Sequence, residues 1–178
     1  MTFLQRAIGA ARLDVPSFEE IEADRSATDQ ALIVVVLSSL AAGIGLSSGL
    51  YNAPVLHRVL LYLLLWVFWA TSTYIVGVYL MPESQTQTDV GELLRTIGFA
   101  ASPGILRIFG MVPVIGGTIY AISTVWMLVA MVVAIRQALD YKSTGRAVIV
   151  CVVTGLIGVV AAALFGALLF QLAEEVVF

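Results

Sequence analysis

Four long, almost uninterrupted apolar stretches constrain this chain more than any other feature. They cover Ala31–Leu50, Val55–Met81, Thr118–Ile135 and Ala147–Leu172. The first holds 20 residues, which as an α-helix measures about 30 Å, the thickness of the hydrocarbon core of a bilayer. Each stretch is therefore predicted to cross a membrane as a helix.

The composition supports a membrane protein. Hydrophobic residues make up 60% of the 178 residues and charged residues 12%, with a mean hydropathy of +1.00, whereas a soluble domain is about 25% charged. A soluble fold of this size would still leave about a third of its unfolded surface in water. We therefore expect an all-α integral membrane protein. The net charge of −3 gives no indication of nucleic-acid binding.

A fifth apolar segment, residues 95–113, is interrupted by Pro103 and carries Arg107. It is either a short kinked span or a re-entrant segment. If it spans, six of the nine basic residues fall on one side of the membrane, as the positive-inside rule requires of the cytoplasmic side. These six are Arg6, Arg12, Arg25, Arg136, Lys142 and Arg146. The sequence thus predicts a bundle of five transmembrane helices in the plasma membrane, with a cytoplasmic amino terminus.

Three regions follow from this prediction: a cytoplasmic amino-terminal segment (1–29), a transmembrane domain (30–173) and a short tail (174–178). In the first region, apolar residues from Phe3 to Ala11 fall on one helical face, which predicts an amphipathic helix lying on the membrane surface over residues 1–13. Ser17 followed by Glu20 has capping-box spacing, so a second short helix is expected to begin at Ser17.

The residues needed for catalysis are scarce. His57 and Cys151 are the single histidine and the single cysteine, about a hundred residues apart, so the sequence predicts no metal site. No candidate base lies in the apolar spans near a serine or the cysteine. We therefore expect no enzyme activity and no cofactor.

Polar residues at the predicted membrane boundaries are candidates for contact with lipids or partner proteins. Arg107 is expected to extend to the outer headgroups, or else to hold an anionic lipid headgroup or a partner's acidic residue. Arg136 and Asp140 are four residues apart and are predicted to share a helical face. The whole set of candidates is Arg95, Arg107, Arg136, Asp140, Lys142 and Arg146.

Tryptophans and small residues inside the predicted spans are candidates for helix packing. Gly45 and Gly49 are spaced by four, which lets helix backbones approach closely. Trp66, Trp69 and Trp126 fall well inside their spans, away from the interfacial belts where Trp is enriched. These residues either pack within the bundle or form a face for a dimer or another membrane protein.

Several stretches together resemble prokaryotic members of the Yip1-domain family of multispanning membrane proteins. They are residues 14–21 (DVPSFEEI), 27–32 (ATDQAL), 95–103 (RTIGFAASP), 126–141 (WMLVAMVVAIRQALDY) and 143–147 (STGRA). The resemblance extends from about residue 10 to 165 and implies a five-helix bundle with a cytoplasmic amino terminus. Eukaryotic members are associated with vesicle trafficking and lipid-modified small GTPases, but their Asp-Leu-Tyr-Gly-Pro motif reads Leu-Tyr-Asn-Ala-Pro here, at residues 50–54. The resemblance therefore implies a fold without an activity.

Two functions remain open. The first is a non-catalytic scaffold or accessory subunit of a membrane protein assembly, in contact with lipids and with other membrane proteins. Its contact surfaces would be the acidic segment Glu19–Asp24 and the basic 136–146 loop, unless these two segments pair with each other. The second is a transporter or lipid-handling protein with Arg107 near its binding site, because interrupted helices often mark such sites.

Overall fold

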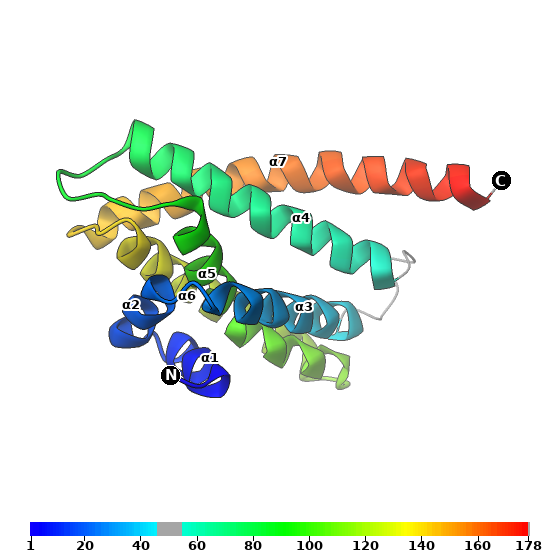
Figure 1. The fold of residues 1–178 in the computed structure, drawn as a ribbon. Coiled ribbons are helices and arrows are strands. Elements are labelled where there is room, and N and C mark those ends of the chain that lie inside the picture. The colour runs from blue at the N-terminus through cyan, green and yellow to red at the C-terminus, as the bar shows by residue number, and fades with distance from the viewer. Residues whose placement is uncertain (46–54, 178) are drawn as a thin grey trace.

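The structure is a computed structural model that describes the backbone of residues 1–45 and 55–177. All regular secondary structure in these two ranges is helical (Figure 1). The helices are α1 (Phe3–Ala11), α2 (Val15–Ala23), α3 (Ala27–Gly45), α4 (Val55–Tyr74) with a π-helical continuation η1 (Ile75–Leu80), α5 (Val90–Ala100), the 3₁₀-helix η2 (Ser102–Met111), α6 (Gly116–Ala138) and α7 (Thr144–Val177).

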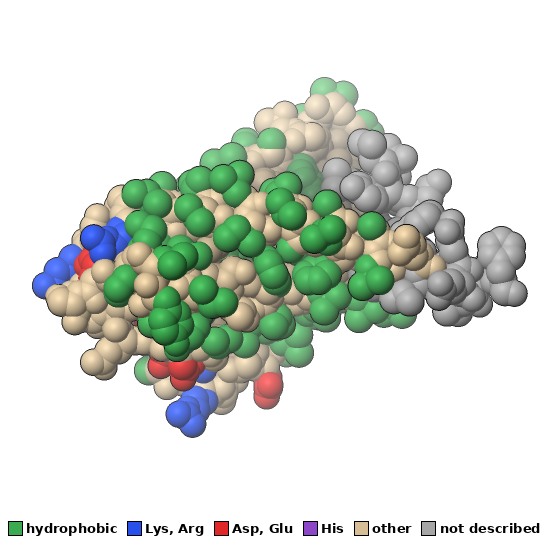
Figure 2. Space-filling view, turned by 90° about the horizontal axis from the view of Figure 1, so that it is seen from above, with side chains coloured by type: hydrophobic (Ala, Val, Ile, Leu, Met, Phe, Trp, Pro, Cys, Tyr) green, Lys and Arg blue, Asp and Glu red, His purple; other side chains and the backbone are tan. Residues whose placement is uncertain are grey.

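Four helical segments are long and apolar enough to cross a membrane, which confirms an all-helical chain of the membrane type. They are Ala27–Gly45, Val59–Leu80, Gly116–Ala138 and Thr144–Leu168. Figure 2 shows hydrophobic side chains covering the flank of the molecule, with charged side chains gathered toward one end. Exposed apolar side chains such as Leu64, Val125 and Leu156 would be costly in water and are expected where a helix faces lipid.

The fifth predicted span corresponds to α5 and η2, which form one broken helical rod. Pro103 lies in the first turn of η2 and cannot donate a backbone hydrogen bond, so the α-helix stops at Ala100. The rod follows α3 in the same direction: Gly98 lies against Ala31, Gly104 against Ser38 and Gly110 against Gly45. Glycine is required at the last contact, because a Cβ on Gly45 would lie 1.9 Å from the carbonyl oxygen of Arg107.

The most deeply buried side chains cluster where α2, α5 and α6 meet. Phe18 and Ile21 of α2 have no exposed surface, and the same holds for Phe99 and Ile135 opposite them. Figure 1 shows α1 and α2 beside the bundle, next to the beginning of α3. The core therefore crosses the boundary predicted at residue 29, and the amino-terminal helices pack as part of the bundle.

The two amino-terminal helices begin at side-chain caps. Thr2 and Gln5 form a capping box that starts α1. Asp14 caps α2, because its carboxylate accepts hydrogen bonds from the Ser17 amide at 3.1 Å and from the Ser17 hydroxyl at 2.5 Å. The cap predicted at Ser17 is therefore wrong: an aspartate three residues earlier takes that role, and Glu20 is left free for a tertiary contact.

Candidate functional site

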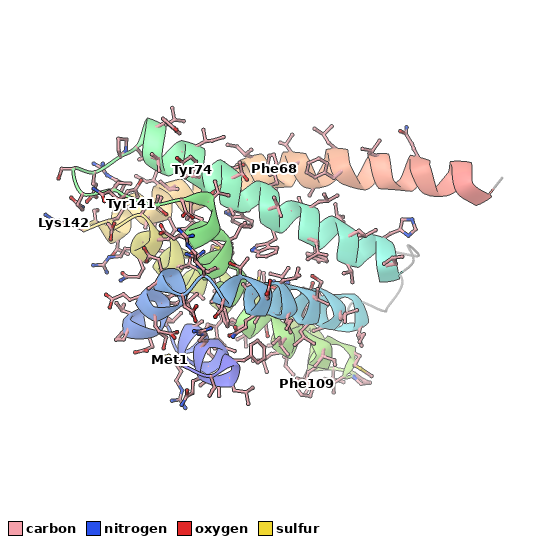
Figure 3. All side chains as sticks on the ribbon, viewed as in Figure 1. Met1, Phe68, Tyr74, Phe109, Tyr141 and Lys142 are labelled. Atoms are coloured by element: carbon pink, nitrogen blue, oxygen red, sulfur yellow. The ribbon has the colours of Figure 1, made fainter. Side chains whose placement is uncertain are left out.

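The polar side chains gather at one end of the bundle. This polar end consists of α1, α2, the 81–89 loop and the 139–143 turn, and Figure 3 shows Tyr141 and Lys142 within it. The opposite end, where α3 finishes and α6 begins, carries Arg107 of η2. The two ends differ in chemistry: one is rich in polar contacts, and the other contains the candidate residue Arg107.

Arg6 of α1 is the centre of the first polar cluster, a contact that the sequence did not predict. Its Nε and Nη2 atoms donate to the two carboxylate oxygens of Glu20 at 2.8 and 2.7 Å, Nη1 donates to Gln30 at 2.9 Å, and Nη2 also meets Asp24. The side chain is only 3% exposed. The Arg6 guanidinium lowers the pKa of Glu20 to about 2, so the pair stays ionised at any physiological pH. One signal was available in the sequence: Glu20 and Asp24 are four residues apart and can bind the same cation.

Arg95 of α5 binds the backbone at the same end of α2. Its guanidinium donates to the carbonyl oxygen of Ile21 at 3.2 Å and to that of Glu22 at 3.2 and 2.5 Å. These carbonyls belong to the last turn of α2 and lack partners within that helix, so a buried cation satisfies them and complements the helix dipole. Arg95 is 5% exposed. Arg95, predicted as a contact for lipid or a partner protein, thus binds α2 inside the bundle.

Acidic residues lie near Arg95. Burial raises the pKa of Glu22 to about 7, with further contributions from the neighbouring charges of Glu92 and Asp140. Arg95 opposes this rise, but its hydrogen bonds go to backbone carbonyls instead of the Glu22 carboxylate. Glu22 is thus a group at the polar end whose charge changes near neutral pH.

The 81–89 loop is bonded to the turn between α6 and α7. Glu83 accepts a hydrogen bond from the backbone amide of Lys142 at 3.0 Å and forms an ion pair with Arg146 at 3.5 Å. Gln85 donates to the carbonyl oxygen of Asp140 at 2.8 Å. The predicted pairing of the acidic segment 19–24 with the basic 136–146 loop is not formed among the described residues. Glu20 and Asp24 bind Arg6, and the basic loop binds Glu83.

Tyr141 strengthens the same junction from inside. Its side chain is 3% exposed, and its hydroxyl lies 3.0 Å from the carbonyl oxygen of Gly77 and 2.8 Å from that of Met81. Both carbonyls stand at the end of the π-helical segment η1, where the last carbonyls of a helix have no partner within it. The hydroxyl therefore closes the end of this helix.

The predicted helical pairing of Arg136 with Asp140 is wrong. Helix α6 ends at Ala138, and Asp140 adopts a left-handed conformation with φ of 53°. Arg136 instead donates from Nε to the carbonyl oxygen of Tyr141 at 3.3 Å. Asp140 and Lys142 remain exposed, which leaves them as surface candidates for lipid or partner contact.

Arg107 has a different environment from the other candidates. The residue is 5% exposed, and its guanidinium carbon lies 5.2 Å from the centre of the Tyr120 ring. The expected extension of this side chain into the outer headgroups is therefore not the conformation observed, because the side chain is enclosed between η2 and α6. A cation over an aromatic face gains modest stabilisation.

Most of the packing candidates serve contacts inside the bundle. The Trp66 indole donates to the carbonyl oxygen of Leu94 at 3.1 Å and Trp69 lies against Gly155 of α7, while Gly45 packs on η2. Gly49 lies outside the described residues. Trp126 is the exception: it is 38% exposed, and its indole donates to the carbonyl oxygen of Ala11 at 2.7 Å.

Trp126 also borders an apolar groove along the outer face of α6. This groove is shallow and wide open, and it is lined by residues of α6 alone: Ala121, Ile122, Val125, Trp126 and Val129. The hydrogen bond to Ala11 fixes the Trp126 side chain on one side of this groove. A second hollow of about 820 Å³ lies on the surface of α1 and α2, bordered by Gln5, Ile8 and Arg12 among others.

These features define an all-helical membrane protein in which buried ionisable side chains mostly fasten helices together. No group of three or more histidine, cysteine, aspartate or glutamate residues in the described part of the chain is placed to hold a metal ion. Comparison with protein-family models, with curated proteins and with solved structures finds no match. The functional argument therefore rests on the contacts described above.

Proposed function

We propose that this protein is a non-catalytic scaffold or accessory subunit of a membrane protein assembly. In this proposal the chain crosses the plasma membrane five times, with its amino terminus in the cytoplasm. The scaffold role is carried by one observation, the apolar groove on α6 that is bordered by the fixed Trp126 side chain.

The five-span arrangement is supported by the contact between the two loops of the polar end. Glu83 and Arg146 are paired, so the 81–89 loop and the start of α7 lie on the same side of any membrane. The chain between them, residues 90–138, must then cross the membrane an even number of times. Helix α6 is long and apolar enough to supply one crossing, and the rod of α5 and η2, which runs beside α3 from Ala31 to Gly45, is the natural candidate for the other.

Cysteine labelling tests this topology. Single cysteines at Ser84, Val114 and Ser143, in a Cys151→Ala background, are treated in intact cells with a membrane-impermeant maleimide. All three positions are exposed. Five spans predict labelling at position 114 without permeabilisation, and at positions 84 and 143 only after it. Labelling of positions 84 and 143 from opposite sides would show that the rod does not span.

The groove on α6 supports a scaffold because it combines the features of a helix-binding surface. Trp126 has a fixed orientation, and its indole N–H is already satisfied by Ala11, so docking costs little side-chain entropy. Ala121 and Val125 leave room for a partner helix to approach between larger neighbours. Partly exposed Trp residues are also enriched where binding energy is concentrated.

Purification in mild detergent tests the scaffold role. The wild-type protein is expected to carry the same set of membrane proteins at stoichiometric level, identified by mass spectrometry. Ala121→Trp fills the groove and should remove them. Leu64→Trp places the same bulk on an exposed position of α4 and should leave them bound. Wild-type protein that purifies without any stoichiometric partner would contradict the proposal.

A Yip1-like fold is part of the proposal, and it rests on the sequence stretches that resemble the family. Residues 14–21 form most of α2. Residues 95–103 contain Arg95, which binds α2, and Pro103, where the rod is interrupted. Residues 126–141 run from Trp126 to Tyr141, whose hydroxyl binds the end of η1. These stretches are distant in sequence yet meet at the polar end. They would be expected to vary together in relatives that share the fold.

Lipid handling or transport is the second candidate function. The observation that favours it is Arg107, a buried cation in an interrupted membrane segment. Coupling to protons or cations has little support, because Asp29, in the first turn of α3, is the single acidic residue in the four apolar spans of the described chain.

A further inference from the structure

Arg107 is a buried cation whose hydrogen-bonding groups lack acceptors. A guanidinium carries five N–H donors, yet none of them forms a hydrogen bond or ion pair with the described residues, and Nε is completely enclosed. Arg6 and Arg95 are equally buried but are bonded to carboxylates or carbonyls. Because burying a charge without a partner is strongly unfavourable, the Arg107 setting indicates a missing anion.

No side chain that the structure describes supplies the missing anion. The acidic residues with described side chains all belong to the polar end: they lie in α2 and the residues flanking it, in the first turns of α3 and α5, in the 81–89 loop and at Asp140. Glu174 and Glu175, near the end of α7, are outside the described side chains. Arg107 lies at the opposite end, beside Gly45, the last residue of α3. The Tyr120 ring offers its face to the cation, but an aromatic face cannot accept five N–H bonds.

The surface around Arg107 is apolar and exposed. Leu106 and Phe109 flank it on η2 and are 39% and 51% exposed, and Met111 at the end of η2 is 61% exposed. Figure 3 shows Phe109 at the edge of the bundle. An arginine enclosed beneath apolar side chains near a membrane boundary matches the two parts of a phospholipid, since acyl chains would cover the apolar rim while the phosphate reaches the guanidinium.

We infer that Arg107 and Tyr120 form a binding site for the phosphate of a phospholipid from the outer leaflet. The guanidinium donates to the phosphate oxygens, and Tyr120 supports the cation from its other side. The inference rests on the proposed five-span arrangement, which places this end of the bundle in the outer leaflet. It does not depend on the scaffold role, because a lipid can occupy the site whether or not a partner binds α6.

Lipid-dependent thermal unfolding in detergent tests the site. Dioleoyl phosphatidylglycerol is the probe, dioleoylglycerol supplies the same acyl chains without phosphate, and sodium phosphate supplies the anion without chains. Delipidated wild-type protein should melt at a higher temperature with the phospholipid and unchanged with the other two. Equal stabilisation by dioleoylglycerol, or saturation by free phosphate, would overturn the inference.

Two variants assign the effect to Arg107. Arg107→Met removes an unpartnered buried charge, so it should melt above the wild type without lipid, while its affinity for the phospholipid falls at least about tenfold through the loss of charged hydrogen bonds. Arg12→Met, at an exposed arginine of the amino-terminal region, should respond to lipid as the wild type does. An unchanged lipid response in Arg107→Met would refute the site.

Two further measurements keep the inference testable. If Arg107→Met does not fold, Arg107→Lys keeps the charge but loses the forked geometry, and it should bind phosphatidylglycerol more weakly than the wild type; equal binding would refute the site. A photo-crosslinker at Phe109 should capture lipid in native membranes. Capture of a protein at stoichiometric yield would instead assign the anion to an acidic side chain of a partner.

Discussion

Replacing Arg95 with methionine should release α2 from the bundle. The guanidinium serves two carbonyl acceptors, those of Ile21 and Glu22. A hydrogen bond to a charged group contributes about 1.5–3 kcal/mol. With the side chain 5% exposed, water replaces little of this loss. Leaving both carbonyls without a donor therefore costs about 3–6 kcal/mol, and about 3 kcal/mol once the carbonyls gain partial access to water.

Amide hydrogen exchange measured by mass spectrometry is the assay. At about 1.4 kcal/mol per factor of ten, a loss of 3 kcal/mol raises the open population of α2 roughly 100-fold, so the α2 peptides should lose protection by that factor. Arg25→Met is the matched control, because Arg25 is exposed and close in sequence. Arg95→Lys should fall between the two, since a single ammonium cannot reproduce the forked contact.

A change of less than tenfold in Arg95→Met, or equal effects in Arg95→Met and Arg25→Met, would refute this reasoning. The first result would mean that the apolar contacts of Phe18 and Ile21 hold α2 without help. The second would mean that exchange reports the loss of positive charge near α2 and not the loss of a specific contact. Protection of the α7 peptides serves as an internal reference, since the hydrogen bonds of Arg95 go to α2 and not to described residues of α7.

Three further predictions concern stability in detergent. Gly45→Ala should lower the melting temperature by several degrees, because its Cβ would lie 1.9 Å from the Arg107 carbonyl oxygen. The control Gly117→Ala, where no atom lies within 4 Å of the added Cβ, should be neutral or slightly stabilising. Equal effects of the two substitutions would refute the close-approach argument. Tyr141→Phe deletes the hydroxyl that closes the π-helical turn and should cost about 1–2 kcal/mol by chemical or thermal unfolding; an unaltered melting temperature would mean that water replaces it. The folded-state pKa of Glu22 is raised from 4.5 to about 7, so the folded state binds more protons than the unfolded state over that range. Stability should therefore fall as pH rises from about 4.5 to 7 and then level off. Glu22→Gln should flatten this profile, and an identical pH dependence in the variant would assign it to another group.

The long apolar runs of the sequence were enough to predict the four long helices of the bundle. Four long apolar stretches appear as helices close to their expected positions, with shifts of a few residues at the ends. The reason is physical: in lipid, a chain segment must satisfy its own backbone hydrogen bonds, so a long apolar run has little choice but a helix. Pro103 also marked the point where the fifth segment leaves the α-helical conformation.

The polar contacts were harder to predict because they join residues that are distant in the sequence. Arg6 meets Glu20 across 14 positions, and Arg95 meets Glu22 across 73. No local pattern distinguishes Arg95, which is buried, from Arg25, which is exposed. The pairing assigned to Arg136 failed for a local reason, since the chain leaves the helix at Ala138 and a left-handed residue at Asp140 redirects it.

The docking of α1 and α2 has a consequence for the timing of biosynthesis. Their contacts come from residues made much later: Arg95 follows the end of α2 by about 70 positions and Trp126 by about 100. At about 5–20 residues per second, a ribosome needs roughly 5–20 seconds to supply both. During that time the apolar face of α2 that contains Phe18 and Ile21 lacks the α5 and α6 side chains against which it is buried in the complete structure. Helices α1 and α2 are made first but can dock only after α5 and α6 have been made. Mutations in α5 or α6 that disturb these contacts should therefore leave the amino-terminal helices undocked.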